Sequence, residues 1–170
     1  LFRSLLNGEQ LFRPHTVQFI IREKKLDSIQ GIELFNFKDS RGDLLARGWF
    51  AQTSYLASLP LAVSMRGIRV RQGNIEIGNE YFIEHLYSER RFSTWHIGEI
   101  HVPYALKTNA RRDGFEQSSA FESFLEQATS LARHLSSLCR SSSKHRSADI
   151  SARQALNKLE RLLSLPYHVD

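Results

Sequence analysis

Hydrophobic and polar residues alternate along much of the first two thirds of the chain, which is the pattern of strands with one buried face. Four segments have this alternation or are rich in β-branched and aromatic residues: residues 17–22, 32–51, 68–77 and 95–102. Turn-forming residues divide two of them, at Asp39-Ser40-Arg41-Gly42 and at Gln72-Gly73-Asn74. Residues 32–51 and 68–77 are therefore each predicted to form a hairpin. A short helix is predicted over residues 79–87.

The last third of the chain follows helical spacing instead. Apolar residues recur every three or four positions from Phe121 to Leu138. Ser119 and Glu122 match a capping box, which predicts that this helix begins at Ser119. The side chains that we expect to face a sheet include Phe124, Leu125 and Leu131.

A second helix is predicted after a serine-rich interruption. Four serines fall within residues 140–148, and an amphipathic pattern follows until Pro166. The predicted organisation is a domain at residues 1–139 that includes the first helix, a linker at 140–148, and a C-terminal amphipathic helix at 149–165. Strands first and helices last predict an α+β fold with a long helix packed on a sheet.

Composition and charge narrow the functional classes. The formal net charge is +5, but no run of five like charges marks a nucleic-acid-binding arm. No apolar segment approaches the roughly 20 residues that cross a bilayer, so no membrane partner is expected. The single Cys139 cannot form an internal disulfide, and its place in an apolar helix stripe favours a buried thiol over a nucleophile. We expect a cytoplasmic protein.

Common catalytic and metal-binding motifs are missing. Gly73 and Gly78 have the glycine spacing of a phosphate-binding loop, but Asn79-Glu80 follows where Lys and Ser or Thr are required. His96 and His101 are five residues apart in a predicted strand, so they fall on opposite faces and cannot share a metal. Glu99 and His101 share a face, either as an acid–base pair or as a structural hydrogen-bonded pair.

Residues 107–116 differ from an ordinary loop. Arg111 and Arg112 lie just before the long helix, where positive charge is unfavourable for the helix dipole. A guanidinium has a permanent charge and a planar fork that suits phosphate oxygens. The alternative is a pair of exposed arginines bound to Asp113 and Glu116.

Two strings of residues suggest a family. Residues 91–99 read Arg-Phe-x-x-Trp-x-Ile-Gly-Glu and residues 109–116 read Asn-Ala-Arg-Arg-Asp-x-Phe-Glu. With the hairpin before them, they resemble the middle, or transducer, domain of GHKL-type ATPases. The resemblance is to heat-shock chaperones of the ninety-kilodalton class, and more strongly to bacterial chaperone-like ATP-binding proteins. It covers about a third of the chain.

The resemblance implies a fold and a site. The fold is the left-handed βαβ type of the second domain of ribosomal small-subunit protein five. Arg112 matches the family arginine that reaches the γ-phosphate of ATP, and Asn109 and Asp113 match the residues that hold its loop. The family has Ser where this chain has Arg111, so Arg111 is the alternate for the catalytic arginine.

The resemblance also implies what is bound elsewhere. ATP and Mg²⁺ would be held by a separate N-terminal nucleotide-binding domain, which is the expected partner beside a homodimer or a protein client. The chain begins at Leu1 and its only methionine is Met65, so we expect a piece of a longer ATPase that is inactive alone.

Two other functions stay open. One is a nucleic-acid-binding module of the same fold, for which Arg66, Arg69 and Arg71 on the second hairpin are the candidates. The even spread of charge and the lack of a stacking aromatic motif make nucleic acid an unlikely partner. The other is a scaffold that dimerises through its C-terminal helices.

Overall fold

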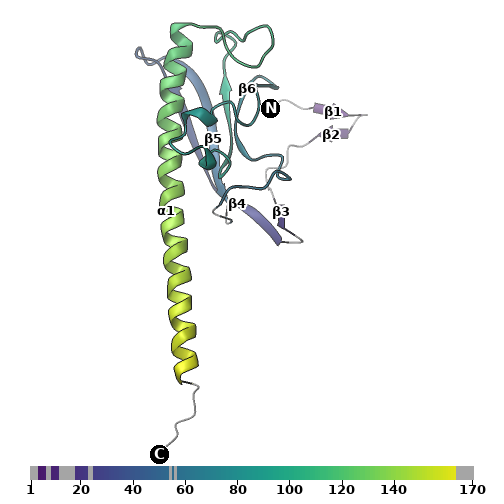
Figure 1. Ribbon diagram of the computed structural model, residues 1–170. Coiled ribbons are helices and arrows are strands. Elements are labelled where there is room, and N and C mark those ends of the chain that lie inside the picture. Colours follow the sequence, from purple (N-terminus) through teal and green to yellow (C-terminus); the bar gives the residue numbers. More distant parts are fainter. Residues whose placement is uncertain are drawn as a thin grey trace, which may run out of the picture.

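The computed structural model describes residues 4–6, 9–11, 18–22, 25–53, 55 and 57–163 of the 170-residue chain. Over these residues the fold is α+β, with a mixed sheet and one long helix (Figure 1). The sheet has the strand order β3-β4-β5-β8-β6-β7. Its strands are β3 (Gln18–Arg22), β4 (Lys25–Lys38), β5 (Leu44–Thr53), β6 (Gly67–Gln72), β7 (Ile75–Ile77) and β8 (Ile97–Val102). A separate ribbon pairs β1 (Ser4–Leu6) with β2 (Glu9–Leu11).

Both predicted hairpins are confirmed. β4 and β5 pair antiparallel, and the Asp39 carboxylate accepts hydrogen bonds from the backbone N–H groups of Arg41 and Asp43, at 2.9 and 2.8 Å, across the turn. β6 and β7 pair antiparallel around Gly73, whose φ of 60° is a left-handed conformation that glycine adopts without a steric cost. The strand predicted at 17–22 is β3, and its first residue lies outside the described part of the chain.

One pair of neighbouring strands is parallel, which local pattern did not predict. β8 enters the sheet between β5 and β6, antiparallel to β5 and parallel to β6. Parallel neighbours require a crossover, and here it passes through β7 and two 3₁₀ turns, η1 (Glu84–Leu86) and η2 (Arg90–Phe92).

The helix predicted at residues 79–87 is wrong. The Asn79 side chain accepts the Tyr81 N–H at 2.9 Å, and the Glu84 N–H donates to the Tyr81 carbonyl, three residues back, at 2.9 Å. Side-chain bonds of this kind compete with helical ones. Burial of Ile83 and Tyr87 against the core then favours a series of tight turns over a continuous helix.

A single helix, α1 (Ser119–Leu163), replaces the two that the sequence predicts. The predicted linker at 140–148 is wrong, because no glycine or proline interrupts the helix and each serine costs only a few tenths of a kcal/mol. The hydroxyls of Ser136 and Ser147 donate to carbonyls four residues back, at 2.7 and 3.0 Å, so they are satisfied within the helix.

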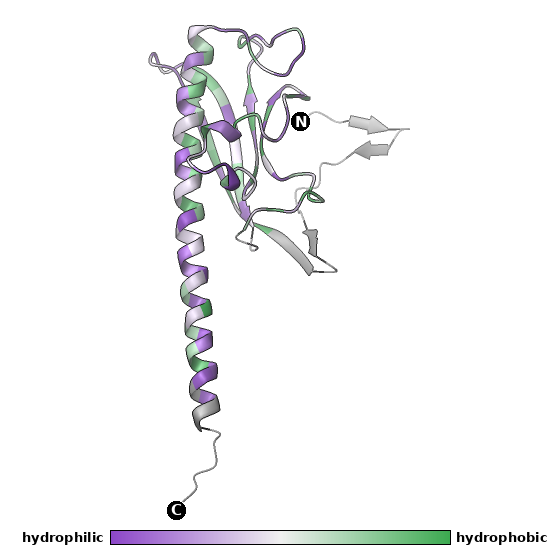
Figure 2. Ribbon diagram, viewed as in Figure 1, coloured by the Kyte–Doolittle hydropathy of each residue, from purple (hydrophilic) through white to green (hydrophobic). Residues whose placement is uncertain are grey.

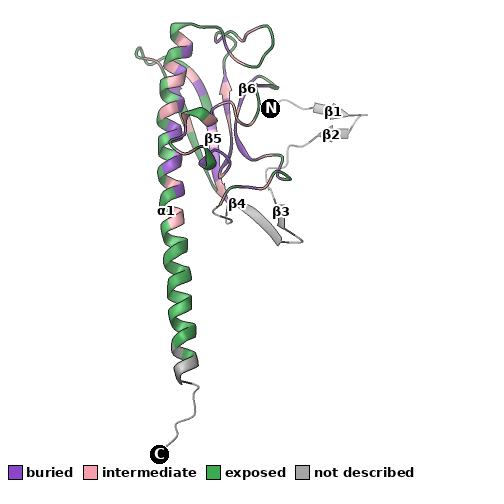
Figure 3. Ribbon diagram, in the orientation of Figure 1, coloured by how far each residue is buried: buried purple, intermediate pink, exposed green. Residues whose placement is uncertain are grey.

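The main core lies between α1 and one face of the sheet. Phe124, Ala128 and Leu135 of α1 are completely buried, and the Phe124 ring meets Phe37 of β4 edge to face at 5.8 Å. Phe124 and Leu131 are buried as predicted, whereas Leu125 is only half-buried. The burial of α1 stops near its middle, and its second half is exposed (Figure 3).

A smaller core lies on the opposite face of the sheet. The segment after β5 contributes Leu59 and Val63, which pack on Ile97 and the half-buried Trp49. Nowhere in the described segments is there a helix that combines the length and apolar character needed to cross a bilayer.

Candidate functional site

The two predicted arginines lie on a short closed loop between β8 and α1. Its base is closed by a bridge between Thr108 and Phe115 and by the Glu116 N–H, which donates to the Lys107 carbonyl at 2.9 Å. Hydrogen bonds among residues 109–113, at the tip of the loop, then determine how the arginines are presented.

Asn109 and Asp113 are joined to each other across the tip of this loop. The Asn109 side-chain amide donates to the Asp113 carboxylate at 2.6 Å, and the Asp113 backbone N–H donates back to the Asn109 side-chain oxygen at 3.2 Å. The Arg112 N–H also donates to the Asn109 carbonyl, at 3.0 Å. Asn109 thus forms three hydrogen bonds across the loop, two through its side chain and one through its backbone carbonyl.

Arg112 has an unusual backbone. Its φ is 58°, and no other non-glycine residue in the described ranges has a positive φ. A left-handed conformation costs an L-residue with a Cβ roughly 1–2 kcal/mol, and such strain concentrates at functional sites. Natural sequences usually place glycine or asparagine at such a position, so the arginine there calls for a reason other than stability.

Arg111 and Arg112 are both exposed, and neither guanidinium forms an ion pair with a carboxylate of the described chain. The alternative pairing with Asp113 and Glu116 is therefore not formed; Asp113 is bound to Asn109 instead. The loop presents two free cationic side chains to solvent.

The loop is anchored to two other elements. The Arg112 carbonyl accepts the Gly78 N–H at 3.0 Å, at the end of β7. Phe115 is buried between Phe82, at 5.9 Å between ring centroids, and Phe121 in the first turn of α1, at 5.6 Å. The arginines consequently have a fixed position relative to the sheet and to the helix.

Gly78 was not singled out from the sequence as part of the site. Its φ is 69°, and a Cβ there would lie 2.7 Å from Phe82 and 3.3 Å from the Asp113 carbonyl oxygen. Only glycine fits at position 78 without displacing its neighbours. The available sequence signal was a glycine just after a strand, which is too common to indicate a contact 34 residues away.

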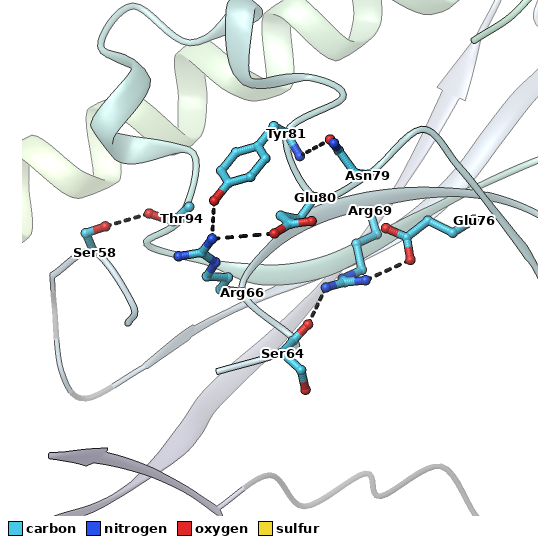
Figure 4. Close-up of polar contacts among 9 residues, drawn as sticks. All are labelled: Ser58, Ser64, Arg66, Arg69, Glu76, Asn79, Glu80, Tyr81 and Thr94. Carbon is cyan, nitrogen blue, oxygen red and sulfur yellow. Dashed lines mark hydrogen bonds and ion pairs between the residues drawn. The ribbon is translucent and has the colours of Figure 1, made fainter. Parts of the chain in front are cut away.

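The arginines considered for nucleic acid are already paired. Arg66 is buried, with its guanidinium 3.4 Å from Glu80 and hydrogen-bonded to the Tyr81 hydroxyl (Figure 4). Arg69 binds Glu76 at 2.7 Å and the Ser64 carbonyl. Figure 4 shows both guanidinium groups turned toward protein partners rather than away from the molecule.

Glu99 joins an arginine and a histidine on the face of the sheet that α1 does not cover. Its carboxylate lies 2.9 Å from His101 Nε2 and 3.6 Å from Arg71 Nη1. The Glu99 side chain is only 12 % exposed. Because Arg71 shares the carboxylate, the geometry favours a structural hydrogen-bonded pair over an independent acid–base pair.

His96 lies on the other face, next to Cys139. Burial lowers the pKa of His96 to about 4, with a smaller effect from the positive charge of His134. Cys139 Sγ is 3.9 Å from His96 Nδ1, and burial raises the pKa of the thiol to about 12. Cys139 is thus a protonated core residue, as predicted. His96 and His101 fall on opposite faces, and the described residues include no cluster of three metal ligands.

Comparison of this chain with models of protein families and with curated proteins finds no match.

Proposed function

We propose that this chain is the transducer domain of a GHKL-type, chaperone-like ATPase, and that Arg112 is the side chain it contributes to ATP hydrolysis. The observation that carries this proposal is the strained backbone of Arg112 at the tip of a locked loop. A sequence that keeps an arginine where glycine would be more stable favours a role for the guanidinium.

The arrangement of the sheet supports the finer fold assignment. We assign the sheet to the left-handed βαβ type of the second domain of ribosomal small-subunit protein five. The parallel pair β6 and β8, the hairpin strand β7 and the long helix after the arginine loop support this. In this chain the crossover has 3₁₀ turns where the family has a short helix.

The residues present fit one part of a nucleotide site. The loop offers an exposed guanidinium without a carboxylate partner in the described chain, which suits a phosphate oxygen. Gly73 and Asn74 form a hairpin turn rather than a phosphate cradle. ATP, held with Mg²⁺ by a separate nucleotide-binding domain, would supply the γ-phosphoryl group.

In this proposal Arg112 stabilises the transition state of hydrolysis more than it stabilises bound ATP. Its guanidinium is solvated in the open state and meets the phosphate only when the two domains close. Its charge then stabilises the shifting negative charge of phosphoryl transfer more than the resting complex, which accelerates hydrolysis rather than tightening binding. Asn109, Asp113 and Gly78 are positioning residues, because they act through the Arg112 backbone.

The domain organisation that follows has residues 1–139 as the transducer-type domain. α1 continues from it without a break and leaves the arginine loop directly, so movement of the loop would be transmitted to the helix. The partners would be the nucleotide-binding domain and, beyond it, a protein client.

The test is Arg112→Ala in the intact protein. We expect ATP hydrolysis to fall far more than ATP binding, by a factor somewhat below the roughly 10³–10⁵ that arginines contribute in GTPases. Arg112→Lys should restore little, because a point charge does not reproduce the planar fork. Steady-state hydrolysis and calorimetric ATP binding separate the two effects.

Arg111→Ala is the matched control, since it removes the neighbouring exposed guanidinium, and its effect should be small. A larger loss for Arg111→Ala would transfer the role to Arg111. Full hydrolysis by the double variant would contradict the proposal. The chain of residues 1–170 alone should not hydrolyse Mg-ATP, and tight stoichiometric ATP binding by it would argue against a divided site.

A further inference from the structure

The second half of α1 projects beyond the sheet. Every described side chain from Lys144 to Lys158 is exposed, whereas buried side chains recur from Phe121 to Cys139 (Figure 3). At 1.5 Å per residue, the 20 residues from Lys144 to Leu163 extend about 30 Å. Hydrophobic residues nevertheless continue along this half (Figure 2).

Apart from Ile150, the apolar residues of the projecting half lie on a different side of the helix. The sheet-facing stripe consists of Phe124, Ala128, Leu131, Leu135 and Cys139. A second set falls on positions 148, 152, 155, 156, 159, 162 and 163. With 100° per residue, the centre of the second stripe is roughly 120° around the helix from the first. The second stripe is therefore not a continuation of the core stripe.

A helix of this length needs further stabilisation. Isolated helices shorter than about 12 to 15 residues are marginal in water, and most helices depend on the packing of an apolar face. Opposite charges at helical spacing are few: Asp149 lies three residues after Arg146 and four before Arg153, and Glu160 has no basic residue three or four positions away. Leu156 is 59 % exposed.

We propose that residues 148–163 of α1 pair with the same segment of a second copy of this chain, as a short parallel two-stranded coiled coil. Positions 148, 152, 155, 159 and 162 have the four-three spacing of a coiled-coil seam over two heptads. Alanines at 148, 152 and 155 permit close approach of the helices, and leucines follow at 159 and 162. This interaction surface does not depend on the proposed ATPase role.

Charge decides both the occupant and its direction. Lys144 and Lys158 lie along one margin of the stripe, and Asp149 lies along the other, with Glu160 and Arg153 farther around the helix on the same side. A parallel copy brings opposite margins together, with Lys144 of each copy facing Asp149 of the other. An antiparallel copy would bring like margins together. Lys144 and Asp149 of one copy are thus complementary to the same two residues of a second copy.

The position of the sheet permits this pairing. The sheet packs on the side of α1 that carries Phe124 and Leu135, and the proposed seam begins only beyond it. Two parallel copies can therefore place their sheets outward at the same end of the helix pair.

The experiment is sedimentation equilibrium of residues 1–170 over a range of concentrations. We expect a reversible monomer–dimer equilibrium, weak because the seam is short. Leu159→Asp places a charge in the seam and should abolish dimerisation. Asn157→Asp adds the same charge on the opposite side of the helix and should leave it unchanged. A chain that stays monomeric at all concentrations, or a Leu159→Asp variant that dimerises normally, would overturn the proposal.

Charge exchange tests the direction. Lys144→Glu and Asp149→Lys should each weaken dimerisation several-fold, and the double variant should restore it, because it exchanges the two margins. Ala148→Cys should form a disulfide with itself under mild oxidation, since parallel copies place the two residues side by side. Failure of the double variant to recover, or crosslinking only between Ala148→Cys and Leu163→Cys chains, would contradict a parallel pair.

Discussion

At the scale of single residues, backbone conformation at Arg112 distinguishes it from its neighbour. Arg111 and Arg112 are both exposed arginines at the same loop tip, but only Arg112 has a left-handed φ. Two residues with the same side chain therefore differ in what they cost the fold. That difference can be measured without ATP.

Arg112→Gly should stabilise the isolated chain. Removing the Cβ relieves about 1–2 kcal/mol of left-handed strain, and the greater freedom of glycine in the unfolded chain offsets about half of it. We expect a gain of about 0.5–1 kcal/mol in the free energy of unfolding, measured by urea denaturation. Arg111→Gly, without this strain to relieve, should be neutral or destabilising. Equal effects for the two variants would show that the φ of Arg112 carries no strain.

Acid should destabilise the fold through His96. In the folded state the pKa of His96 is about 4, mainly because the ring is buried, whereas it is about 6.5 in an unfolded chain. Between these values the unfolded chain binds the extra proton, so stability is complete above pH 6.5 and is lost as the pH falls toward 4. From pH 7.5 to pH 5 we expect a loss of about 2 kcal/mol from this group.

His96→Gln is the control for this pH dependence. It keeps a polar side chain beside Cys139 but does not titrate, so its free energy of unfolding should change less between pH 7.5 and pH 5. Urea denaturation at both pH values measures the difference. Parallel curves for the two proteins would mean that His96 is not buried as a neutral ring.

At the scale of elements, the start of α1 depends on a different serine from the one predicted. Ser118 precedes the helix, and its hydroxyl accepts the Phe121 N–H at 3.2 Å. Its carbonyl accepts the Glu122 N–H at 3.0 Å, the first bond of the helix. Ser118 is therefore the N-cap and Ser119 the first helical residue.

The two serines provide a matched pair of variants. Ser118→Ala removes the cap and should lower the free energy of unfolding by about 1 kcal/mol. Ser119→Ala replaces an exposed first-turn residue and should have almost no effect. Chemical denaturation of both variants measures the difference, and a reversed order would place the cap at Ser119.

At the scale of the whole molecule, α1 belongs to two environments. Its first half closes the core of the sheet, whereas the described side chains from Lys144 to Lys158 are exposed and only Arg146 among them lies over an aromatic ring, that of Trp95, at 5.9 Å. The stability of the folded domain should therefore depend on the first half alone, and association on the second.

Truncation after Ser143 tests this division. At concentrations where the chain is monomeric, we expect the free energy of unfolding to change by less than about 0.5 kcal/mol, as for other surface changes. Truncation after Ala132 removes Leu135 and Cys139 from the core and should unfold the domain. Circular dichroism and urea denaturation compare them, and a large loss after Ser143 would show that the projecting half contributes to the fold.

The sequence by itself determined the features that arise within a few residues of one another. Turn chemistry at Asp39 and Gly73 predicted both hairpins, and helical spacing predicted the burial of Phe124 and Leu131. The candidate loop and the locking pair Asn109 and Asp113 came from a local motif. In each case the determining interactions are short-range.

Tertiary structure alone decided the rest. The parallel pairing of β6 with β8 joins strands about 30 residues apart, and local propensity carries no information about such partners. The hydrogen bond from the Gly78 N–H to the Arg112 carbonyl depends on the same long-range packing. Local sequence did not decide whether α1 continues through its serines. Their weak helix propensity opposes the helix only slightly, and the absence of glycine and proline permits it.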